Sequence, residues 1–230
     1  MKLNGTSSNT LVNDHELADA IGENHSFKSL ETPIRKDAFM LSDEKKIDLI
    51  SSHFHEIMHI LGLDMDDESL KGTPYRVAKM YVNEVFSGLK EENKPTPTMF
   101  ENHYGYEQML VERDISFYST CEHHFVSIFG KAHVAYFATG NVIGLSKLNR
   151  IVQYYARRPQ VQERLTEQIA NELKKILETE DVAVVMDANH LCVASRGVKD
   201  ISSSTVTASY HGKFKDASTR SELLKHIYSR

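Results

Sequence analysis

The segment "STCEHHFVSIFG" brings one cysteine and two adjacent histidines, Cys121, His123 and His124, into four positions. The chain's second cysteine, Cys192, lies far along the sequence in "NHLCVASRG". Thiolate and imidazole together form a ligand set that suits zinc. Two cysteines and one histidine make three protein ligands, which leave a coordination position for water, as in catalytic sites. The residue types therefore predict a metal centre that does chemistry.

Two other interpretations fit the same residues. Two cysteines in a reducing compartment can be buried thiols that pack as small hydrophobes. A structural zinc site has four protein ligands, and His190 lies close enough in sequence to Cys192 to be the fourth. The spacing leaves open whether His123 or His124 is the ligand.

The segment around Cys192 has the composition of a β-strand, and we interpret "HLCVAS" as one. Alternate side chains of a strand share a face, so His190, Cys192, Ala194 and Arg196 are expected to point one way. Such a face suits neither a core nor a plain solvent surface. An edge strand with a chance mixture of polar residues is the alternative.

A candidate anion site follows from "GLSKLNRIV". Ser146 is expected to cap a helix that carries Lys147 in its first turn and Arg150 three residues further on. Helix N-termini expose unpaired N–H groups and attract anions. With Arg196 these residues could clamp a phosphate. A solvated basic face is the plainer alternative.

The next helix is expected to open at Pro159, in "RPQVQERLT", with Glu163 in its first turn. The helix dipole is a sufficient local explanation for that carboxylate. Arg157 and Arg158 precede the proline, and we interpret them as surface charges. Local sequence alone gives none of these residues a chemical role.

The remaining elements must position these segments. Residues 1–41 are expected to form a flexible arm with a short helix around residues 16–21. Helical periodicity and caps predict one helix from Ser42 to Gly62 and another from Thr73 and Pro74 to Gly88. A linker follows over residues 90–98.

From about residue 108 the pattern changes to that of strands. Strands are predicted over residues 108–120, 125–138, 182–188, 190–195 and 203–210. A capping box from Thr219 to Glu222 predicts a last helix. This order indicates an α+β fold, in which two helices cover one face of an antiparallel sheet.

Such a sheet has two open edges, and pairing between subunits into a closed barrel would cover them. A homo-oligomer is therefore expected. We divide the chain into an N-terminal arm (1–41), an N-terminal helical region (42–105) and a catalytic domain (106–230).

Composition narrows the function. The 230 residues are 40% hydrophobic and carry a formal net charge of −5, which supports a packed core and gives no general reason to bind nucleic acid. We find no apolar run that could span a membrane and no secretory signal at the N-terminus, so the cytoplasm is the expected location.

Five blocks taken together resemble the GTP cyclohydrolase I family: "TPYRVAKMYVNEVFSGL", "STCEHHF", "GLSKLNRIVQYYARRPQVQERLT", "HLCVASRG" and "SSTVTASYHGKF". The resemblance runs from about residue 42 to the C-terminus. At "ASRG", many relatives have a basic residue in place of Ala194 or Ser195. The resemblance implies a tunnelling fold, with sheets paired between subunits into the barrel of a toroidal homodecamer of two stacked pentamers.

The resemblance also implies an activity and its residues. The family converts GTP and water into 7,8-dihydroneopterin triphosphate and formate, with Zn²⁺ as cofactor, in the first step of pterin and folate biosynthesis. Matched block by block, the implied roles are metal ligation by Cys121, His124 and Cys192; acid–base catalysis by His123, His190 and Ser146; guanine binding by Gln162 and Glu163; and ribose–triphosphate binding by Ser146, Lys147, Arg150 and Arg196.

Two rival functions remain to be weighed. A related tunnelling-fold nitrile reductase uses a cysteine nucleophile and NADPH, but the full ligand set and the pair His123 and His190 argue against it. A non-enzymatic nucleotide-binding module with structural zinc would bind GTP without turnover and would have four protein ligands.

Overall fold

The computed structural model describes residues 29–138 and 140–229. The chain divides into two compact units, Met1–Leu30 and Glu31–Arg230, and every element below belongs to the second. The short helix predicted around residues 16–21 lies outside the described residues. The proposed divisions after residues 41 and 105 stay predictions.

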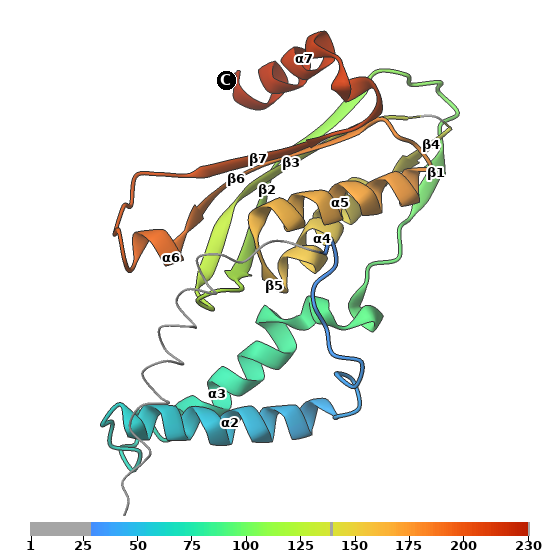
Figure 1. Ribbon diagram of the computed structural model, residues 1–230. Coiled ribbons are helices and arrows are strands. Elements are labelled where there is room, and N and C mark those ends of the chain that lie inside the picture. The colour runs from blue at the N-terminus through green and yellow to red at the C-terminus, as the bar shows by residue number, and fades with distance from the viewer. Residues whose placement is uncertain (1–28, 139, 230) are drawn as a thin grey trace, which may run out of the picture. The chain divides into compact units, whose positions relative to one another are not determined.

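Two predicted helices open the described chain, α2 (Asp43–Ile60) and α3 (Thr73–Met80) (Figure 1). Ser42 caps α2, because its hydroxyl oxygen accepts from the Lys45 backbone N–H at 3.3 Å. Gly62 follows α2 with a φ of +87°, a left-handed conformation that favours glycine. The cap of α3 is Gly72 and not Thr73, so this helix begins one residue earlier than predicted.

The chain beyond α3 changes its helical type twice, through the π-helix η1 (Tyr81–Val85) and the 3₁₀ helix η2 (Ser87–Leu89). Gly88 marks a close approach of two backbones. A Cβ there would lie 2.0 Å from the Tyr154 carbonyl oxygen, while its N–H donates to the Arg157 carbonyl oxygen at 3.0 Å. The predicted linker contains a further 3₁₀ turn, η3 (Glu91–Asn93).

A five-stranded sheet in the order β5-β2-β3-β6-β7 forms the centre of this unit. Its strands are β2 (Met109–Cys121), β3 (Ser127–Phe137), β5 (Pro159–Gln160), β6 (Val182–His190) and β7 (Thr205–Tyr210). All neighbours pair antiparallel except β2 with β5. The sequence missed a second sheet, in which β1 (Met99–Glu101) pairs with β4 (Asn141–Ile143).

Helices cover both faces of the large sheet, unequally (Figure 1). As predicted, α4 (Leu145–Ala156) and α5 (Gln162–Leu177) lie together on one face, and their apolar residues join those of the strands in the main core. On the other face, α7 (Ala217–Tyr228) and the turn η4 (Gly212–Lys215) cover one end, where Phe214, Leu223 and Ile227 pack on Ala183 and Val185. The structure therefore confirms a mixed α/β fold built on an antiparallel sheet.

The predicted strand over residues 190–195 is wrong beyond its first residue. β6 ends at His190, and Leu191–Ala194 form a single helical turn, α6. The reason lies in the neighbouring strand, because the last pair between β3 and β6 is Ile128 with His190. Without a partner strand, the chain after His190 turns away.

Three predicted helix starts also need correction. Gly144 and not Ser146 is the N-cap of α4, so Ser146 lies inside the first turn. The segment at Pro159 pairs with the end of β2 as strand β5, and α5 begins only at Gln162. The last helix begins at Ala217, so Thr219 lies in its first turn instead of capping it.

The interpretation of Arg158 as a surface charge is wrong. This residue is 7% exposed, and its guanidinium lies 4.6 Å and 4.7 Å from the ring centres of Tyr154 and Tyr155. Its Nε donates to the Gly88 carbonyl oxygen at 2.7 Å. Stacking on aromatic faces explains how arginine is buried between α4 and the chain after α3.

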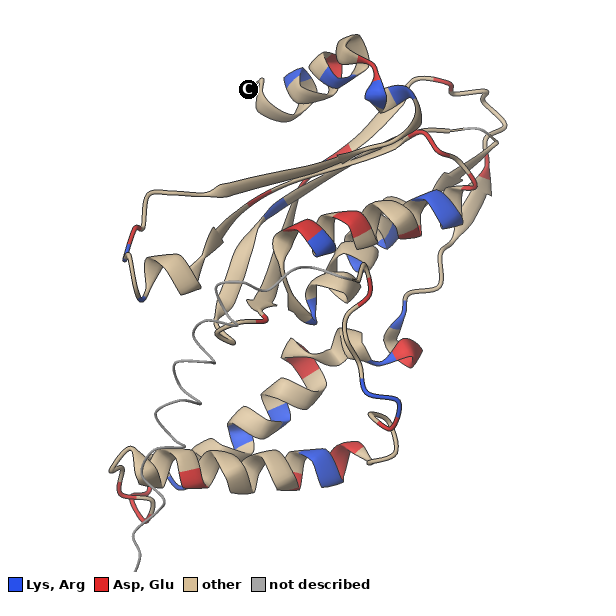
Figure 2. Cartoon of the chain, viewed as in Figure 1, with Lys and Arg blue, Asp and Glu red and all other residues tan. Residues whose placement is uncertain are grey.

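Acidic and basic residues are interspersed along the helices, while the central strands carry fewer of them (Figure 2). Within the part of the chain that the structure describes, no helix combines the length and the apolar character needed to cross a membrane.

Candidate metal centre and its surroundings

The sharp turn after β2 presents the first ligands. Two backbone hydrogen bonds close this turn, from the Phe125 N–H to the Cys121 carbonyl oxygen at 2.9 Å and from the Cys121 N–H to the Val126 carbonyl oxygen at 2.8 Å. Phe125 has a φ of +54°, which is strained for a non-glycine residue. The turn buries Cys121 and leaves His124 exposed.

Cys192 reaches the same place from α6. The Sγ atoms of Cys121 and Cys192 and a ring nitrogen of His124 all lie within 4.8 Å of one another. Zinc with bonds of about 2.0–2.3 Å holds tetrahedral ligand atoms roughly 3.5 Å apart, so a small closure brings this group to a metal geometry. Burial, and then the neighbouring Cys121, raises the pKa of Cys192. A cation at this position would favour the thiolates.

The two adjacent histidines have different positions. His124 belongs to the group of three ligands, whereas His123 Nδ1 lies 3.9 Å from Cys121 Sγ and its side chain is 38% exposed. The two rings meet edge to face, with centroids 6.5 Å apart. His123 is therefore beside the metal group with its ring accessible, a position suited to proton transfer.

His190 lies at the end of β6, where the first residues of β3 pair with it. Its Nε2 lies 2.7 Å from Gln162 Oε1. Burial lowers the pKa of His190, and Glu163 opposes this shift. His190 is thus held against a protein partner and is not a member of the metal group, which leaves three protein ligands.

Gln162 is only 2% exposed, and its amide explains the orientation of His190. The amide nitrogen donates to the carbonyl oxygens of Met186 and Thr205, at 3.3 Å and 2.8 Å, and to Thr207 Oγ1 at 3.1 Å. Because carbonyl oxygens only accept, Oε1 must face His190, and His190 Nε2 must be the nitrogen that carries hydrogen. This arrangement favours a role for Gln162 through His190, and its sequence-predicted contact with a base stays a prediction.

Glu163 and Arg196 both extend toward solvent beside this group. Glu163 is exposed on the first turn of α5, directly after Gln162. Arg196 Nη1 donates to His124 Nε2 over 2.7 Å, so that nitrogen is the acceptor in this arrangement. Arg196 is therefore positioned at the metal group, where it can also meet an anion.

Ser146, Lys147 and Arg150 are not brought to the metal group within one chain. They lie in the first half of α4, which follows β4, whereas the other end of α4 leads to β5 beside Cys121. The 12 residues of α4 span about 18 Å, so its first turn lies roughly a helix length away. Within one chain, these three predicted residues therefore lie apart from the predicted metal ligands.

Sequence reasoning missed Glu122 and Arg164. Their side chains form an ion pair, with Arg164 Nη1 2.5 Å from Glu122 Oε2 and Nη2 3.3 Å from Oε1. One signal was available, since a basic residue in a first helical turn opposes the helix dipole and needs a reason to be there.

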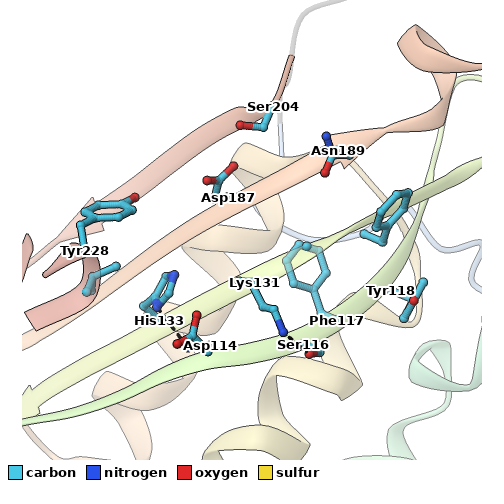
Figure 3. Close-up of a pocket in the computed structure, with 13 residues that line it drawn as sticks. Asp114, Ser116, Phe117, Tyr118, Lys131, His133, Asp187, Asn189, Ser204 and Tyr228 are labelled. Carbon is cyan, nitrogen blue, oxygen red and sulfur yellow. Dashed lines mark hydrogen bonds between the residues drawn. The ribbon is translucent and has the colours of Figure 1, made fainter. Parts of the chain in front are cut away.

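A well-formed pocket lies elsewhere, on the sheet face that carries α7 (Figure 3). It has a volume of about 560 Å³, and its lining includes Asp114, Lys131, His133, Asp187 and Tyr228. Its polar groups bond to each other, for example Lys131 Nζ to Ser116 Oγ at 2.6 Å. We place the chemistry at the Cys-His-Cys group, because its three ligand atoms lie within 4.8 Å of one another, and among the described residues the imidazole and carboxylates of the pocket do not form such a group.

The fold and the site together define a class: a mixed α/β protein whose Cys-His-Cys group can hold a metal through three ligands, with two further histidines beside it. The comparisons make the assignment specific. The sequence profile of the family described as GTP cyclohydrolase I matches residues 50–228. The chain belongs to the GTP cyclohydrolase I family.

Similar proteins cover nearly the whole chain. A GTP cyclohydrolase 1 of Flavobacterium johnsoniae is 55% identical over 217 residues, which are 94% of this chain and 97% of that protein. The GTP cyclohydrolase 1 of Citrobacter koseri is 52% identical over 87% of this chain and 90% of its own length. The one from Salmonella arizonae is 51% identical with the same coverage.

Proposed function

We propose that this chain hydrolyses GTP at C8 of the purine, with ring opening and rearrangement to 7,8-dihydroneopterin triphosphate and formate. This reaction is the first step of pterin and folate biosynthesis. One observation carries the proposal: Cys121, His124 and Cys192 converge at one end of the sheet, with His123 and His190 beside them. Family membership and 55% identity to a GTP cyclohydrolase 1 support it.

We assign Cys121, His124 and Cys192 as zinc ligands. Two thiolates and an imidazole suit zinc, and three protein ligands leave one position open. When bound, the ion would supply an activated water, because it lowers the pKa of coordinated water toward about 7. The hydrogen bond between His190 and Gln162 supports three ligands over a fourth histidine ligand.

Guanine recognition belongs to Glu163. Guanine presents N1–H and the 2-amino group side by side, and a carboxylate accepts both. Glu163 is exposed and close enough to His190 to influence its charge. We therefore assign the purine a position over the metal group, with C8 toward the histidines. Gln162 contributes to the same site by fixing the orientation of His190 through their hydrogen bond.

Proton transfer belongs to His123 and His190. His123 stands beside Cys121 with an accessible ring, so it can deliver a proton to the imidazole ring of the base while water adds at C8. His190 presents Nδ1 as its basic nitrogen, because Nε2 donates to Gln162. We assign it, with Ser146, to the later transfers that open and rearrange the ribose after C8 leaves as formate.

The triphosphate is assigned to Lys147, Arg150 and Arg196, with Ser146 near the ribose. Since the first turn of α4, with Ser146 and Lys147, lies about a helix length from the metal group, and Arg150 lies at the middle of α4, we propose that the site forms between subunits. The open edge of β7 supports this proposal, because an unpaired strand can receive a neighbour. We propose the tunnelling fold and the homodecamer of two pentamers on the same grounds.

The decisive experiment incubates the purified protein with GTP and Zn²⁺. Formate is assayed directly, and the oxidised neopterin product is detected by fluorescence. Release of both in equal amounts is expected. A nucleotide-binding module with structural zinc would bind GTP and release neither, and that outcome would overturn the proposal.

Light scattering on the same sample tests the assembly: a fully active particle of 26.2 kDa would contradict a shared site. Cytoplasmic location stays a prediction.

A further inference from the structure

We infer that the ion pair between Glu122 and Arg164 is a positioning device, which holds the turn with the metal ligands in register with the base-binding turn of α5. This inference rests on the proposed function. Glu122 lies between the ligand Cys121 and the acid–base residue His123. Arg164 directly follows Glu163, the residue assigned to guanine. The pair therefore joins the two halves of the reaction site.

The geometry of the pair is that of a rigid clamp. Both terminal guanidinium nitrogens of Arg164, Nη1 and Nη2, reach the carboxylate of Glu122, one to each oxygen, at 2.5 Å and 3.3 Å. The side chains are only 7% and 18% exposed. Bidentate arginine–carboxylate pairs fix orientation as well as distance. A single lysine could not replace this fork.

Backbone contacts support the same junction. The Glu122 N–H donates to the Gln160 carbonyl oxygen at 3.0 Å, and Cys121 pairs with Gln160 across β2 and β5. Glu122 Oε1 also lies 3.9 Å from His123 Nε2. The carboxylate thus faces both the helix that carries Glu163 and the ring that is assigned to proton transfer.

Stability alone does not explain why the pair is there. Replacing a buried ion pair by well-packed apolar residues is often neutral or stabilising. Arg164 also lies in the first turn of α5, where the helix dipole disfavours a cation. A role in positioning the site explains both the buried ion pair and the cation in the first turn, because a displacement of about 1 Å at a reaction centre can lower the rate on the order of 10²-fold.

The test separates positioning from stability. Glu122→Gln leaves Arg164 buried without its charge partner and should lower both stability and kcat. The double variant Glu122→Gln with Arg164→Met has no unpaired buried charge, so its stability should recover. If the pair positions the site, kcat should stay roughly 10- to 100-fold below wild type in both variants. The Kd for GTP and the zinc content should stay close to wild type, since Glu163 and the ligands are intact.

The control is a second ion pair, in which Nζ of Lys94, on the linker, lies 2.8 Å from Oε1 of Glu172, on α5. Lys94→Met with Glu172→Gln should change stability but not kcat. Recovery of kcat together with stability in the Glu122 and Arg164 double variant would overturn the inference and leave a structural role. Wild-type protein that releases no formate would instead overturn the proposed function and this inference with it.

Discussion

His190, which is half-buried, and His133, which is buried, lie on the same sheet, and desolvation lowers the pKa of both. His190 lies at the end of β6 with the metal group beside it. His133 is 5% exposed within β3, and its Nδ1 accepts from the Asp114 N–H at 3.2 Å (Figure 3). The two rings therefore share the direction of their pKa shift and differ in what surrounds them.

The difference shows which feature marks a reaction site. The His133 pocket has a volume of about 560 Å³ and contains two carboxylates, Asp114 and Asp187, but no thiol, and its groups do not converge as those of the Cys-His-Cys group do. The His190 region combines two thiols, three imidazoles and an exposed carboxylate. These groups come from three short segments: the turn after β2, the first turn of α5, and the end of β6 with α6. Convergence of groups with complementary chemistry, and not cavity volume or a perturbed histidine, identifies the site. Each variant below tests that distinction.

The largest effect should come from the metal ligands. Cys121→Ser and Cys192→Ser should each remove bound zinc and turnover together, by more than the roughly 10- to 100-fold that loss of an outer-shell partner costs. The particle size should not change, because sheet pairing does not involve the metal. Metal analysis, formate release and light scattering on the same preparations check this. His133→Gln is the matched control and should keep full activity and metal; full activity in a metal-free cysteine variant would refute the zinc assignment.

His123→Ala should have the next largest effect. It removes a proton donor but neither a ligand nor a phosphate contact, so kcat should fall by roughly 10²–10⁴ while zinc content and GTP affinity persist. Steady-state kinetics, metal analysis and a GTP binding titration measure the three quantities. Loss of zinc in this variant would show that His123 and His124 have the opposite roles.

The elements that could be predicted were those fixed by local pattern. The periodicity of α2 and the alternation along β2 and β3 are properties of the segments themselves. The predictions of a strand over residues 190–195 and of a helix start at Pro159 were wrong, because the conformation there depends on where a neighbouring strand ends or pairs. The prediction that Arg158 is a surface charge was wrong for a similar reason, since its burial depends on two tyrosines and a distant glycine.

The candidate site divides in the same way. The grouping of Cys121 and Cys192 with one of two adjacent histidines could be predicted because few roles suit these residue types in this combination, whereas the choice of His124 came from the family resemblance. The bonds from Gln162 to His190 and from Arg164 to Glu122 could not, because they join residues 28 and 42 positions apart through side-chain geometry. Ser146 and Lys147 were grouped with the metal ligands by resemblance, and a single chain keeps them apart.

Glu163→Ala should change specificity more than folding. ATP presents a bare N1 where GTP presents N1–H, and a buried group left unpaired costs about 1–3 kcal/mol. Wild type should therefore favour GTP over ATP by at least roughly 10- to 100-fold in kcat/KM, with ITP between them. The variant should lose most of its activity on GTP and narrow this ratio. The test is to measure kcat/KM for the three nucleotides with wild type and variant. An unchanged GTP/ATP ratio would show that Glu163 does not recognise guanine and only interacts with the helix dipole.

The smallest effect should come from His133, and it concerns stability alone. Burial holds the pKa of His133 below its ordinary value of about 6.5, with Arg113 and Lys131 acting in the same direction and Asp114 and Asp187 opposing. A histidine with a lowered folded-state pKa binds fewer protons in the folded than in the unfolded protein. Its contribution to stability is therefore present above about pH 6.5 and is lost as the pH falls through the folded-state pKa.

His133→Gln should remove that part of the pH dependence, because the glutamine amide can accept from the Asp114 N–H without taking up a proton. The free energy of unfolding in urea, measured from about pH 7.5 to about pH 5, should fall less steeply for the variant than for wild type. His190 and His211, whose pKa values burial also lowers, are present in both proteins and cancel in the difference. Turnover at pH 7.5 should be equal in the two proteins. Equal slopes would show that His133 does not titrate on unfolding in this range, and a loss of turnover would place chemistry in the pocket that we assign to structure.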